Sequence, residues 1–278
     1  MRTGTNPERN NKVKPFGNII VSAIVHLPNQ EGYHEDRLKV IQTSLNTMRR
    51  NAGVDCQVLV WDNGSYSKMI TWLKNQYKPD YLILSPNIGK ASARAGIVRM
   101  VPPETIIGIA DDDMYYYPGW LEASMRIMMH FPNVGQVSGY PVRTQFRWGC
   151  QKTRAWGARR GMLKGKFIEP QWDRDFCTSI GREYSHQLAT TVNDYDYKIP
   201  WRGVEAFAVA HHCQFIAYAG KLARFCKYDD DAMGDEKPFD IAVDAAGLLR
   251  LTTVQRYTRH IGNRLDDDLI ELEKGGHA

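Results

Sequence analysis

The chain has 278 residues, of which 43% are hydrophobic and 24% are charged, and its formal net charge is +5 at pH 7. This composition is typical of a folded protein and excludes extensive disorder, while the length allows one large α/β domain or two tightly joined halves. The mild positive charge is compatible with an anionic ligand or acceptor, but it does not identify one.

The cysteines and the apolar runs bear on the compartment in which the protein works. The five cysteines are widely spaced without a Cys-x-x-Cys pair, which argues against a disulfide framework or a structural zinc site and favours a reducing cytoplasm. Residues 1–17 are polar and predict a flexible tail, not a signal peptide. No apolar run is long enough to cross a bilayer, so we expect a cytoplasmic protein that visits a membrane surface at most.

In its first half, the chain alternates apolar runs with segments of helical periodicity. The apolar runs, each expected to be a strand, are residues 18–25, 57–61, 81–84 and 106–110. Helical spacing is found at residues 38–48, 69–77 and 91–98. Strands that alternate with helices imply crossover connections and a mainly parallel central sheet flanked by helices.

A polar residue stands at the carboxyl end of each of these strands. The four residues are His26, Asp62, Asn87 and Asp111. Because ligands of open α/β sheets bind beyond the carboxyl ends of the strands, these residues predict a polar cleft along one edge of the sheet.

Three consecutive aspartates, Asp111 to Asp113, follow the fourth apolar run. Alternate residues of an extended chain face the same way, so Asp111 and Asp113 can share a ligand while Asp112 turns aside. Two carboxylates held this close repel each other, which favours a site for a divalent cation and a diphosphate. The alternative is a solvated turn that caps the next helix. The triple aspartates at residues 229–231 and 266–268 do not follow a buried strand, and the second favours a helix start.

The second half of the chain has weaker periodicity. A helix is expected at residues 121–129, strands at 134–138, 207–218 and 251–257, and a further helix at 241–249. Between them, the segment from Arg143 to Lys166 is basic and aromatic, and no acidic residue occurs from residue 123 to 168. This basic segment predicts contact with an anionic acceptor, with a solvated loop as the alternative. His211, His212 and Cys213 lack metal-ligand spacing and are interpreted as pocket lining or core.

Two common nucleotide-binding motifs are absent, since neither Gly-x-Gly-x-x-Gly after the first strand nor Gly-x-x-x-x-Gly-Lys-Ser/Thr occurs. A series of short motifs instead resembles the family 2 glycosyltransferases of the GT-A fold. The matching pieces, which span residues 19–262, are His26-Leu27-Pro28, Asp62-Asn63-Gly64-Ser65, Asn87-Ile88-Gly89-Lys90 with Arg94, Asp111-Asp112-Asp113 with Pro118-Gly119-Trp120, Gly234-Asp235-Glu236 and His260-Ile261-Gly262.

The resemblance implies one Rossmann-like GT-A domain at residues 18–265. Residues 18–120 would form its nucleotide-sugar-binding half and residues 121–265 its acceptor-binding half, with an acidic, glycine-rich tail at 266–278. In such a domain Asp113 would bind Mn²⁺ or Mg²⁺ directly, with Asp111 beside it. His260 would complete the metal shell, because imidazole suits manganese better than magnesium, and the alternative is a hydrogen-bonded histidine without a metal.

The same resemblance implies roles in donor binding at the sheet edge. Asp62 would bind uracil or another base, and the alternative for this residue is a turn-forming Asp-Asn-Gly. The first strand end would line the nucleoside pocket, and the residues that follow the third strand would approach the ribose and phosphates. The implied donor-binding residues are His26, Pro28, Asp62, Asn87, Lys90, Arg94, Asp111 and Asp112.

An acidic pair near residue 235 is implied to supply the catalytic base. The family has a Glu-Asp-like pair at this place, and here the order is reversed as Asp235-Glu236. By position Glu236 matches the base that deprotonates the acceptor, with Asp235 as the nearby alternative. Asp235 could instead cap a helix that has Pro238 in its first turn.

The function expected from these features is metal-dependent, inverting glycosyl transfer from a nucleotide-sugar, first of all a UDP-sugar, to an acceptor hydroxyl. The acceptor would be a glycan, a lipid-linked sugar or a nucleic acid, and the basic segment favours a polyanionic one. The alternatives are a bacteriophage-type enzyme that glycosylates a hydroxymethylated base in DNA, a sugar nucleotidyltransferase, and a non-catalytic nucleic-acid-binding protein.

Overall fold

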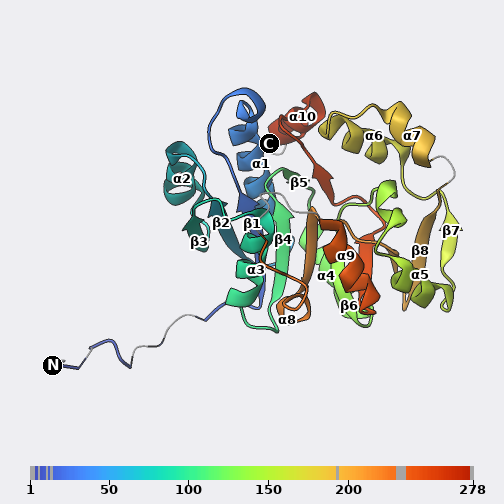
Figure 1. Ribbon diagram of the computed structural model, residues 1–278, viewed down its shortest axis with the longest axis horizontal. Coiled ribbons are helices and arrows are strands. Elements are labelled where there is room, and N and C mark those ends of the chain that lie inside the picture. Colours follow the sequence, from blue (N-terminus) through green and yellow to red (C-terminus); the bar gives the residue numbers. More distant parts are fainter. Residues whose placement is uncertain are drawn as a thin grey trace.

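The computed structural model describes residues 4–5, 7–10, 12, 15–191, 194–229 and 236–275. Within these residues, one sheet has ten strands in the order β3-β2-β1-β4-β10-β6-β11-β9-β8-β7, and β12 and β5 form a separate pair (Figure 1). The strands are β1 (Ile19–Val25), β2 (Gln57–Asn63), β3 (Tyr81–Ser85), β4 (Ile106–Asp111), β5 (Met114–Tyr116), β6 (Val134–Ser138), β7 (Leu163–Gly165), β8 (Asp196–Trp201), β9 (Val204–Phe207), β10 (Gln214–Tyr218), β11 (Leu249–Thr253) and β12 (Thr258–His260).

Helices connect the strands and cover the sheet. They are α1 (Arg37–Arg50), α2 (Ser67–Trp72), α3 (Lys90–Met100), α4 (Trp120–His130), α5 (Gln151–Ala158), α6 (Pro170–Ser179), α7 (Tyr184–Thr191), α8 (Ala219–Leu222), α9 (Glu236–Ala245) and α10 (Asp267–Gly275), with short turns η1 (Gly32–His34), η2 (Leu73–Tyr77) and η3 (Arg143–Arg147). No helix among the described residues is both long and apolar enough to span a membrane.

The first four strands are parallel and end at the same edge of the sheet. Their register pairs Ile24 with Asp111 and Val25 with Asp62, so the polar residues predicted at the strand ends lie along one line. Along β1, Val21 and Val25 belong to one buried apolar cluster, while Ile20 belongs to another. Alternate side chains of a strand point to opposite faces, so the sheet is buried on both sides. The predicted α/β fold class is confirmed.

The sheet changes character at β10, which runs antiparallel to both β4 and β6. Beyond it, β11 is parallel to β6, and β9, β8 and β7 continue the sheet in antiparallel pairs. Strand β10 therefore joins the parallel first half to a mixed second half. The parallel sheet predicted from the first half of the sequence does not extend to the far edge.

The segment with little periodicity, residues 139–201, contains η3, α5, β7, α6, α7 and β8. Its folding depends on buried charge, because Arg143 is 7% exposed and its guanidinium lies 2.6 Å from Asp173 Oδ2 and 2.9 Å from Asp196 Oδ1. Within the predicted anion-binding segment, Arg143 is thus part of the core. Arg154 and Arg160 also lie over aromatic rings, of Tyr197 and Trp156 respectively.

Two further predictions differ from the structure. The strand expected at 207–218 is interrupted, because residues 208–213 form a loop between β9 and β10, and this loop carries His211 to Cys213. The segment from residue 266, expected to be a tail, forms α10, whose Leu269 is fully buried beside Val40 and Tyr115. Glu273 of the same helix also pairs with Arg50 at 2.7 Å and accepts the Tyr115 hydroxyl at 3.0 Å, so apolar and charged contacts together hold α10.

Candidate active site

The triple aspartate forms the turn between β4 and β5. Asp112 points back into the protein, where its Oδ2 accepts the His26 backbone N–H at 3.1 Å and its Oδ1 pairs with the Arg37 guanidinium. Arg37 also reaches Asp113 Oδ2 at 3.1 Å. The predicted turning aside of Asp112 has a structural cause, since this carboxylate ties the end of β1 to α1.

The carboxylates of Asp111 and Asp113 experience different electrostatic environments. Burial raises the pKa of Asp111, to which the charges of Glu236 and Asp113 add while Lys90 opposes them. Burial also acts to raise the pKa of Asp113, but His260 and Arg37 outweigh it, so this pKa lies below its ordinary value. Neighbouring acids are expected to separate in this way, and Asp113 is the one that remains ionised more readily.

His260 reaches Asp113 because β12 pairs with β5. The register places His260 opposite Met114, and the Ile261 backbone N–H donates to the Asp113 carbonyl at 2.7 Å. As a result His260 Nε2 lies 3.4 Å from Asp113 Oδ1. The sequence separates these residues widely, yet they are neighbours, as the interpretation of His260 as a metal ligand requires.

The tautomer of His260 follows from its other hydrogen bond. Ser179 Oγ lies 2.8 Å from His260 Nδ1 and donates its own hydrogen to the Phe176 carbonyl at 2.7 Å. The hydroxyl has one hydrogen to give, so Nδ1 must donate to it and neutral His260 carries a lone pair on Nε2. That lone pair faces a carboxylate oxygen.

These residues fit a divalent cation. Asp113 Oδ1 is buried and accepts no hydrogen bond from the described residues, and an imidazole lone pair is turned towards it. A proton or a cation must lie between two such acceptors, and a metal-binding histidine usually donates its other ring N–H to an oxygen, as His260 does to Ser179 Oγ. Carboxylate oxygen is a preferred ligand of Mg²⁺ and Mn²⁺, and imidazole nitrogen is a common ligand of transition-metal ions.

A chain of charges runs from Asp111 to the start of α9. Lys90 Nζ lies 2.6 Å from Asp111 Oδ1 and 3.0 Å from Glu236 Oε2, and Arg94 Nη1 lies 2.7 Å from Glu236 Oε1. Burial acts to raise the pKa of Glu236, but Lys90, His212 and Arg94 lower it to about 2. The predicted base is therefore held by two cations. Asp235, the alternative, lies outside the described residues.

A cavity of about 250 Å³ adjoins the triple aspartate and is called here the aspartate cavity. Its lining is Ile24, His26, Tyr33, His34, Arg37, Asn63, Asn87, Lys90, Asp111, Asp112 and Asp113. The structure thus brings together most of the residues predicted to bind the donor. Tyr33, His34, Arg37 and Asn63 were not predicted, and only the polar loop before the first helix hinted at the first two.

Three predicted donor residues lie outside this lining. Pro28 is exposed, and Arg94 is directed to Glu236. Asp62 is buried, and its Oδ1 accepts the Ser65 backbone N–H at 3.1 Å, as in a turn, while its Oδ2 accepts no hydrogen bond from the described residues. Both interpretations of Asp62 therefore keep a structural basis.

The turn after β2 requires glycine at position 64. Gly64 has a φ of +87°, and a Cβ there would lie 2.8 Å from the Asn87 backbone nitrogen. The β2 turn and the loop after β3 thus approach each other at the back of the aspartate cavity. Asn63 Nδ2 donates to Asn87 Oδ1 at 3.0 Å across this contact.

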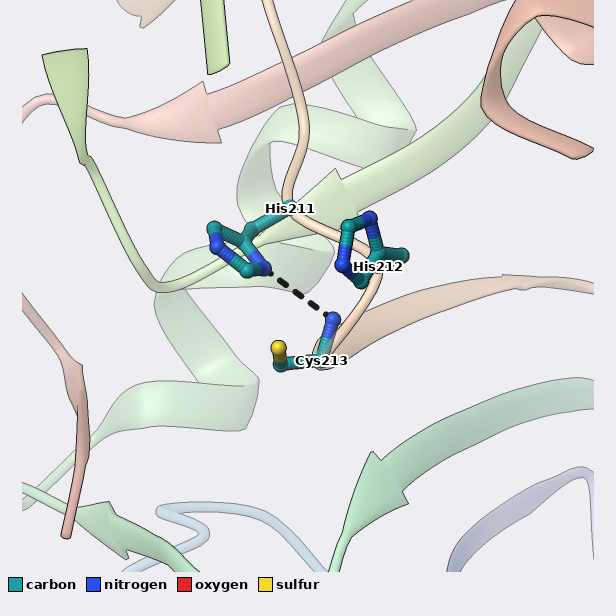
Figure 2. Close-up of side chains that lie close together, drawn as sticks. All are labelled: His211, His212 and Cys213. Atoms are coloured by element: carbon teal, nitrogen blue, oxygen red, sulfur yellow. Dashed lines mark hydrogen bonds between the residues drawn. The ribbon is translucent and has the colours of Figure 1, made fainter. Parts of the chain in front are cut away.

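Figure 2 shows His211, His212 and Cys213 close together, with ligand atoms within 4.8 Å of one another. Two of the nitrogens are engaged. His211 Nδ1 accepts the Cys213 backbone N–H at 3.1 Å, and His212 Nδ1 lies 3.0 Å from Asp240 Oδ2. Because His211 then carries its hydrogen on Nε2, it has no lone pair free for a metal. The group lines a pocket, as predicted.

That pocket, called here the Trp148 cavity, has a volume of about 640 Å³. Its lining is Thr144, Gln145, Arg147, Trp148, Phe176, Ile180, Arg182, His186, Gln187, Thr190, His211, His212, Cys213, Lys237 and His260. None of these described lining residues is an aspartate or a glutamate, so cations and imidazoles alone supply its charge. His260 belongs to this wall and contacts Asp113, so the two cavities meet at the proposed metal ligands.

One comparison with known proteins identifies a family for this chain. The family model described as glycosyl transferase family 2 matches residues 33–185, more than half of the chain. No curated protein sequence matches the chain.

Solved glycosyltransferase structures are among those that resemble this one. S. aureus TarS is 16% identical over 43% of this chain and 21% of that chain, with a TM-score of 0.33. The mannosyltransferase PcManGT from Pyrobaculum calidifontis, in complex with GDP-Man and Mn²⁺, is 19% identical over 46% of this chain and 37% of that chain, with a TM-score of 0.34. GalNAc-T7 with UDP, GalNAc and Mn²⁺ is 13% identical over 89% of this chain and 44% of that chain, with a TM-score of 0.47. This chain spans less than half the length of each of them.

Proposed function

The chain belongs to glycosyl transferase family 2, and from that membership together with its site we propose that it transfers a sugar from a nucleotide-sugar to an acceptor hydroxyl with inversion. The observation that carries the proposal is the position of His260, whose Nε2 lies 3.4 Å from the buried, unbonded Asp113 Oδ1 where two cavities meet. A family match alone does not require such an arrangement. A site for a cation between donor and acceptor does.

The donor would bind in the aspartate cavity. Its nucleoside end would lie along His26 and Asn63, with Asp62 accepting from a base N–H, and uridine is the nucleoside tested first. Its diphosphate would approach the ends of β3 and β4, where Lys90 now pairs with Asp111. A donor phosphate would offer Lys90 a third anionic partner beside Asp111 and Glu236, and Arg94 would remain paired with Glu236.

Asp113 and His260, with Asp111, would hold Mn²⁺ or Mg²⁺. Such an ion, when bound, neutralises the charge that develops on a departing diphosphate. The protein's part is to fix the ligands: Ser179 sets the tautomer of His260, and Arg37 holds Asp113 through its other oxygen at 3.1 Å.

The acceptor would bind in the Trp148 cavity. Its indole ring offers a surface for a sugar ring, and Arg182 and Lys237 give the same wall positive charge. An acceptor that carries phosphate or carboxylate groups therefore fits better than a neutral one. Glu236, or Asp235 beside it, is the carboxylate assigned to acceptor deprotonation.

The basic segment from Arg143 to Lys166, which suggested a nucleic-acid acceptor, has fewer free cations than its sequence implies. Arg143 is buried in ion pairs, and Arg147 is paired with Asp194 at 3.0 Å. A backbone-tracking surface needs free cations along an extended path. The cavity instead suits a short acceptor.

The test is a panel of UDP-glucose, UDP-galactose, UDP-N-acetylglucosamine and GDP-mannose, with and without Mn²⁺, with release of free nucleotide as the readout. We expect one uridine donor to be turned over only with metal, and Asp113→Ala to reduce that turnover by about 100- to 1,000-fold. Asp268→Ala is the matched control, because Asp268 belongs to a triple aspartate at the exposed start of α10. Equal turnover by the Asp113 and Asp268 variants would reject the proposed metal site.

A further inference from the structure

His212 is held so that one ring nitrogen remains available beside the Trp148 cavity. Its Nδ1 lies 3.0 Å from Asp240 Oδ2, and a carboxylate only accepts, so Nδ1 carries the hydrogen and Nε2 carries the lone pair. The side chain is 17% exposed and belongs to the cavity wall. This is the arrangement in which a carboxylate sets the tautomer and orientation of a histidine base.

Asp240 is well placed to orient His212. It is fully buried on α9, and its Oδ1 lies 2.6 Å from Nη2 of Arg250, which is also fully buried. The carboxylate is thus fixed at both oxygens, one to a guanidinium and one to the imidazole. A buried ionised pair of this kind retains a constant orientation.

Glu236, in contrast, is poorly suited to accept a proton directly. Both of its oxygens are engaged, with Arg94 at 2.7 Å and Lys90 at 3.0 Å. Its pKa of about 2, the net result of burial opposed by Lys90, His212 and Arg94, gives it little affinity for a proton at neutral pH. Among the described residues, the wall of the Trp148 cavity includes His212 but not Glu236.

The two acids instead surround the imidazole. Glu236 Oε2 lies 3.5 Å from His212 Nε2, on the side opposite Asp240. Burial acts to lower the pKa of His212, but Asp240 and Glu236 outweigh it and raise the pKa above its ordinary value. An imidazolium formed here would lie between two negative charges, which stabilise it.

From this geometry we infer that His212 is the residue that removes the acceptor proton, that Asp240 positions it, and that Glu236 acts through it. This inference rests on the proposed function, and within it His212 replaces Glu236 as the proton acceptor. The acceptor O–H proton passes to His212 Nε2 as the acceptor oxygen bonds to the anomeric carbon. The bond from that carbon to the diphosphate breaks, and the nucleoside diphosphate leaves with the electron pair. The proton then passes from His212 to solvent.

The experiment removes the imidazole of His212 by substitution and then adds free imidazole to the solution. His212→Ala should lower UDP release from the donor that the wild-type chain turns over, with water as acceptor, by about 100- to 10,000-fold. Calorimetric binding of UDP with Mn²⁺ should stay unchanged, because the carboxylates that pair with His212 among the described residues are Asp240 and Glu236, which are not proposed metal ligands. Imidazole in the buffer should restore part of the lost rate. His130→Ala, an exposed histidine on α4, is the matched control and should keep the wild-type rate.

The possible outcomes separate the inference from the proposed function. If the wild-type chain releases no nucleotide from any donor, the proposed function fails and the inference fails with it. If the wild-type chain is active and His212→Ala retains its rate, only the inference is overturned. Rescue of Glu236→Gln by imidazole, in place of His212→Ala, would likewise reject His212 as the proton acceptor.

The positioning role of Asp240 is tested by the pH dependence of the reaction rate, because the loss of a purely structural residue would not shift that profile. The charged groups that face His212 are Asp240 and Glu236 on α9, Lys90 on α3 and the adjacent His211. Without the Asp240 carboxylate, protonated His212 loses a stabilising partner, so Asp240→Asn should move the acidic limb of the rate profile to lower pH. Asp244→Asn removes another buried acid of α9, which binds the backbone of α5, and should leave that limb in place. An unmoved limb in Asp240→Asn would contradict the positioning role.

Discussion

His260 and His212 have nearly the same local geometry, but the carboxylates that they face differ in their hydrogen-bond partners. In each, Nδ1 donates to a fixed oxygen, Ser179 Oγ or Asp240 Oδ2, and Nε2 faces a carboxylate at 3.4 or 3.5 Å. The facing carboxylates differ. Asp113 Oδ1 accepts no hydrogen bond from the described residues, whereas both oxygens of Glu236 are bound by cations.

The partners that the facing carboxylate already has decide what the histidine can do. Asp113 Oδ1 has no hydrogen-bond partner among the described residues and faces the lone pair of His260 Nε2, which is an arrangement that a cation between the two atoms would stabilise. The Glu236 carboxylate is already neutralised by Lys90 and Arg94 and does not require a further cation. The lone pair of His212 Nε2 is therefore free to accept a proton. One imidazole is thus suited to a metal and the other to acid–base chemistry, although their distances to a carboxylate are almost equal.

The largest effect expected from this comparison concerns Glu236. Its folded pKa of about 2 lies below the ordinary value of 4.5, so it stabilises the fold above pH 4.5 and loses that contribution as pH falls through 2. Glu236→Gln should therefore lower the free energy of unfolding at pH 7 by up to about 3 kcal/mol, and the difference from the wild-type chain should vanish in acid. Urea unfolding at several pH values measures it. A constant difference down to pH 2 would show that Glu236 is not held by the two cations.

A smaller effect distinguishes the two histidines directly. His260→Ala should weaken Mn²⁺ binding in the presence of UDP by about 100-fold, since the ion loses a ligand, while His212→Ala should leave it within about twofold. Isothermal titration calorimetry with Mn²⁺ measures both variants. Equal losses would mean that the two imidazoles are not specialised in the way proposed.

The smallest effect tests the hydroxyl that orients His260. Ser179→Ala removes the acceptor of the Nδ1 hydrogen but leaves the imidazole in place, so Mn²⁺ affinity should fall by about 10-fold. Ser179→Thr keeps the hydroxyl and should bind closer to wild type. If Ala and Thr behave alike, the tautomer of His260 is set by something other than this bond.

The sequence predicted the first half of the site better than the second. Strands β1 to β4 are continuous β-branched runs with polar ends, and their parallel register leaves few ways to arrange those ends. For this reason Asp111 and Asp113 were predicted at the edge of the sheet where the structure places them. The sequence did not reveal Arg37, because a cation in the first turn of an amphipathic helix usually faces solvent.

The helices and strands of residues 139–201 were not predicted, because this segment lacks apolar periodicity and is stabilised in part by ion pairs between distant residues. Arg143 is distant in sequence from Asp173 and Asp196, and nothing local marks the three as partners. The interrupted strand at 207–218 failed for a related reason, since an apolar run does not show where a chain leaves a sheet. His212 and Asp240 are likewise joined only by the fold.

One backbone contact has a mechanical consequence. The Asp111 N–H donates to the Cys213 carbonyl at 2.8 Å, and the antiparallel pairing of β10 with β4 begins at the next residue, Gln214, so a continuous ladder joins the end of β4 to the loop that carries His212. A substrate that displaces the aspartate turn should also displace the end of this loop. Binding in the aspartate cavity is therefore expected to shift the backbone that lines the Trp148 cavity.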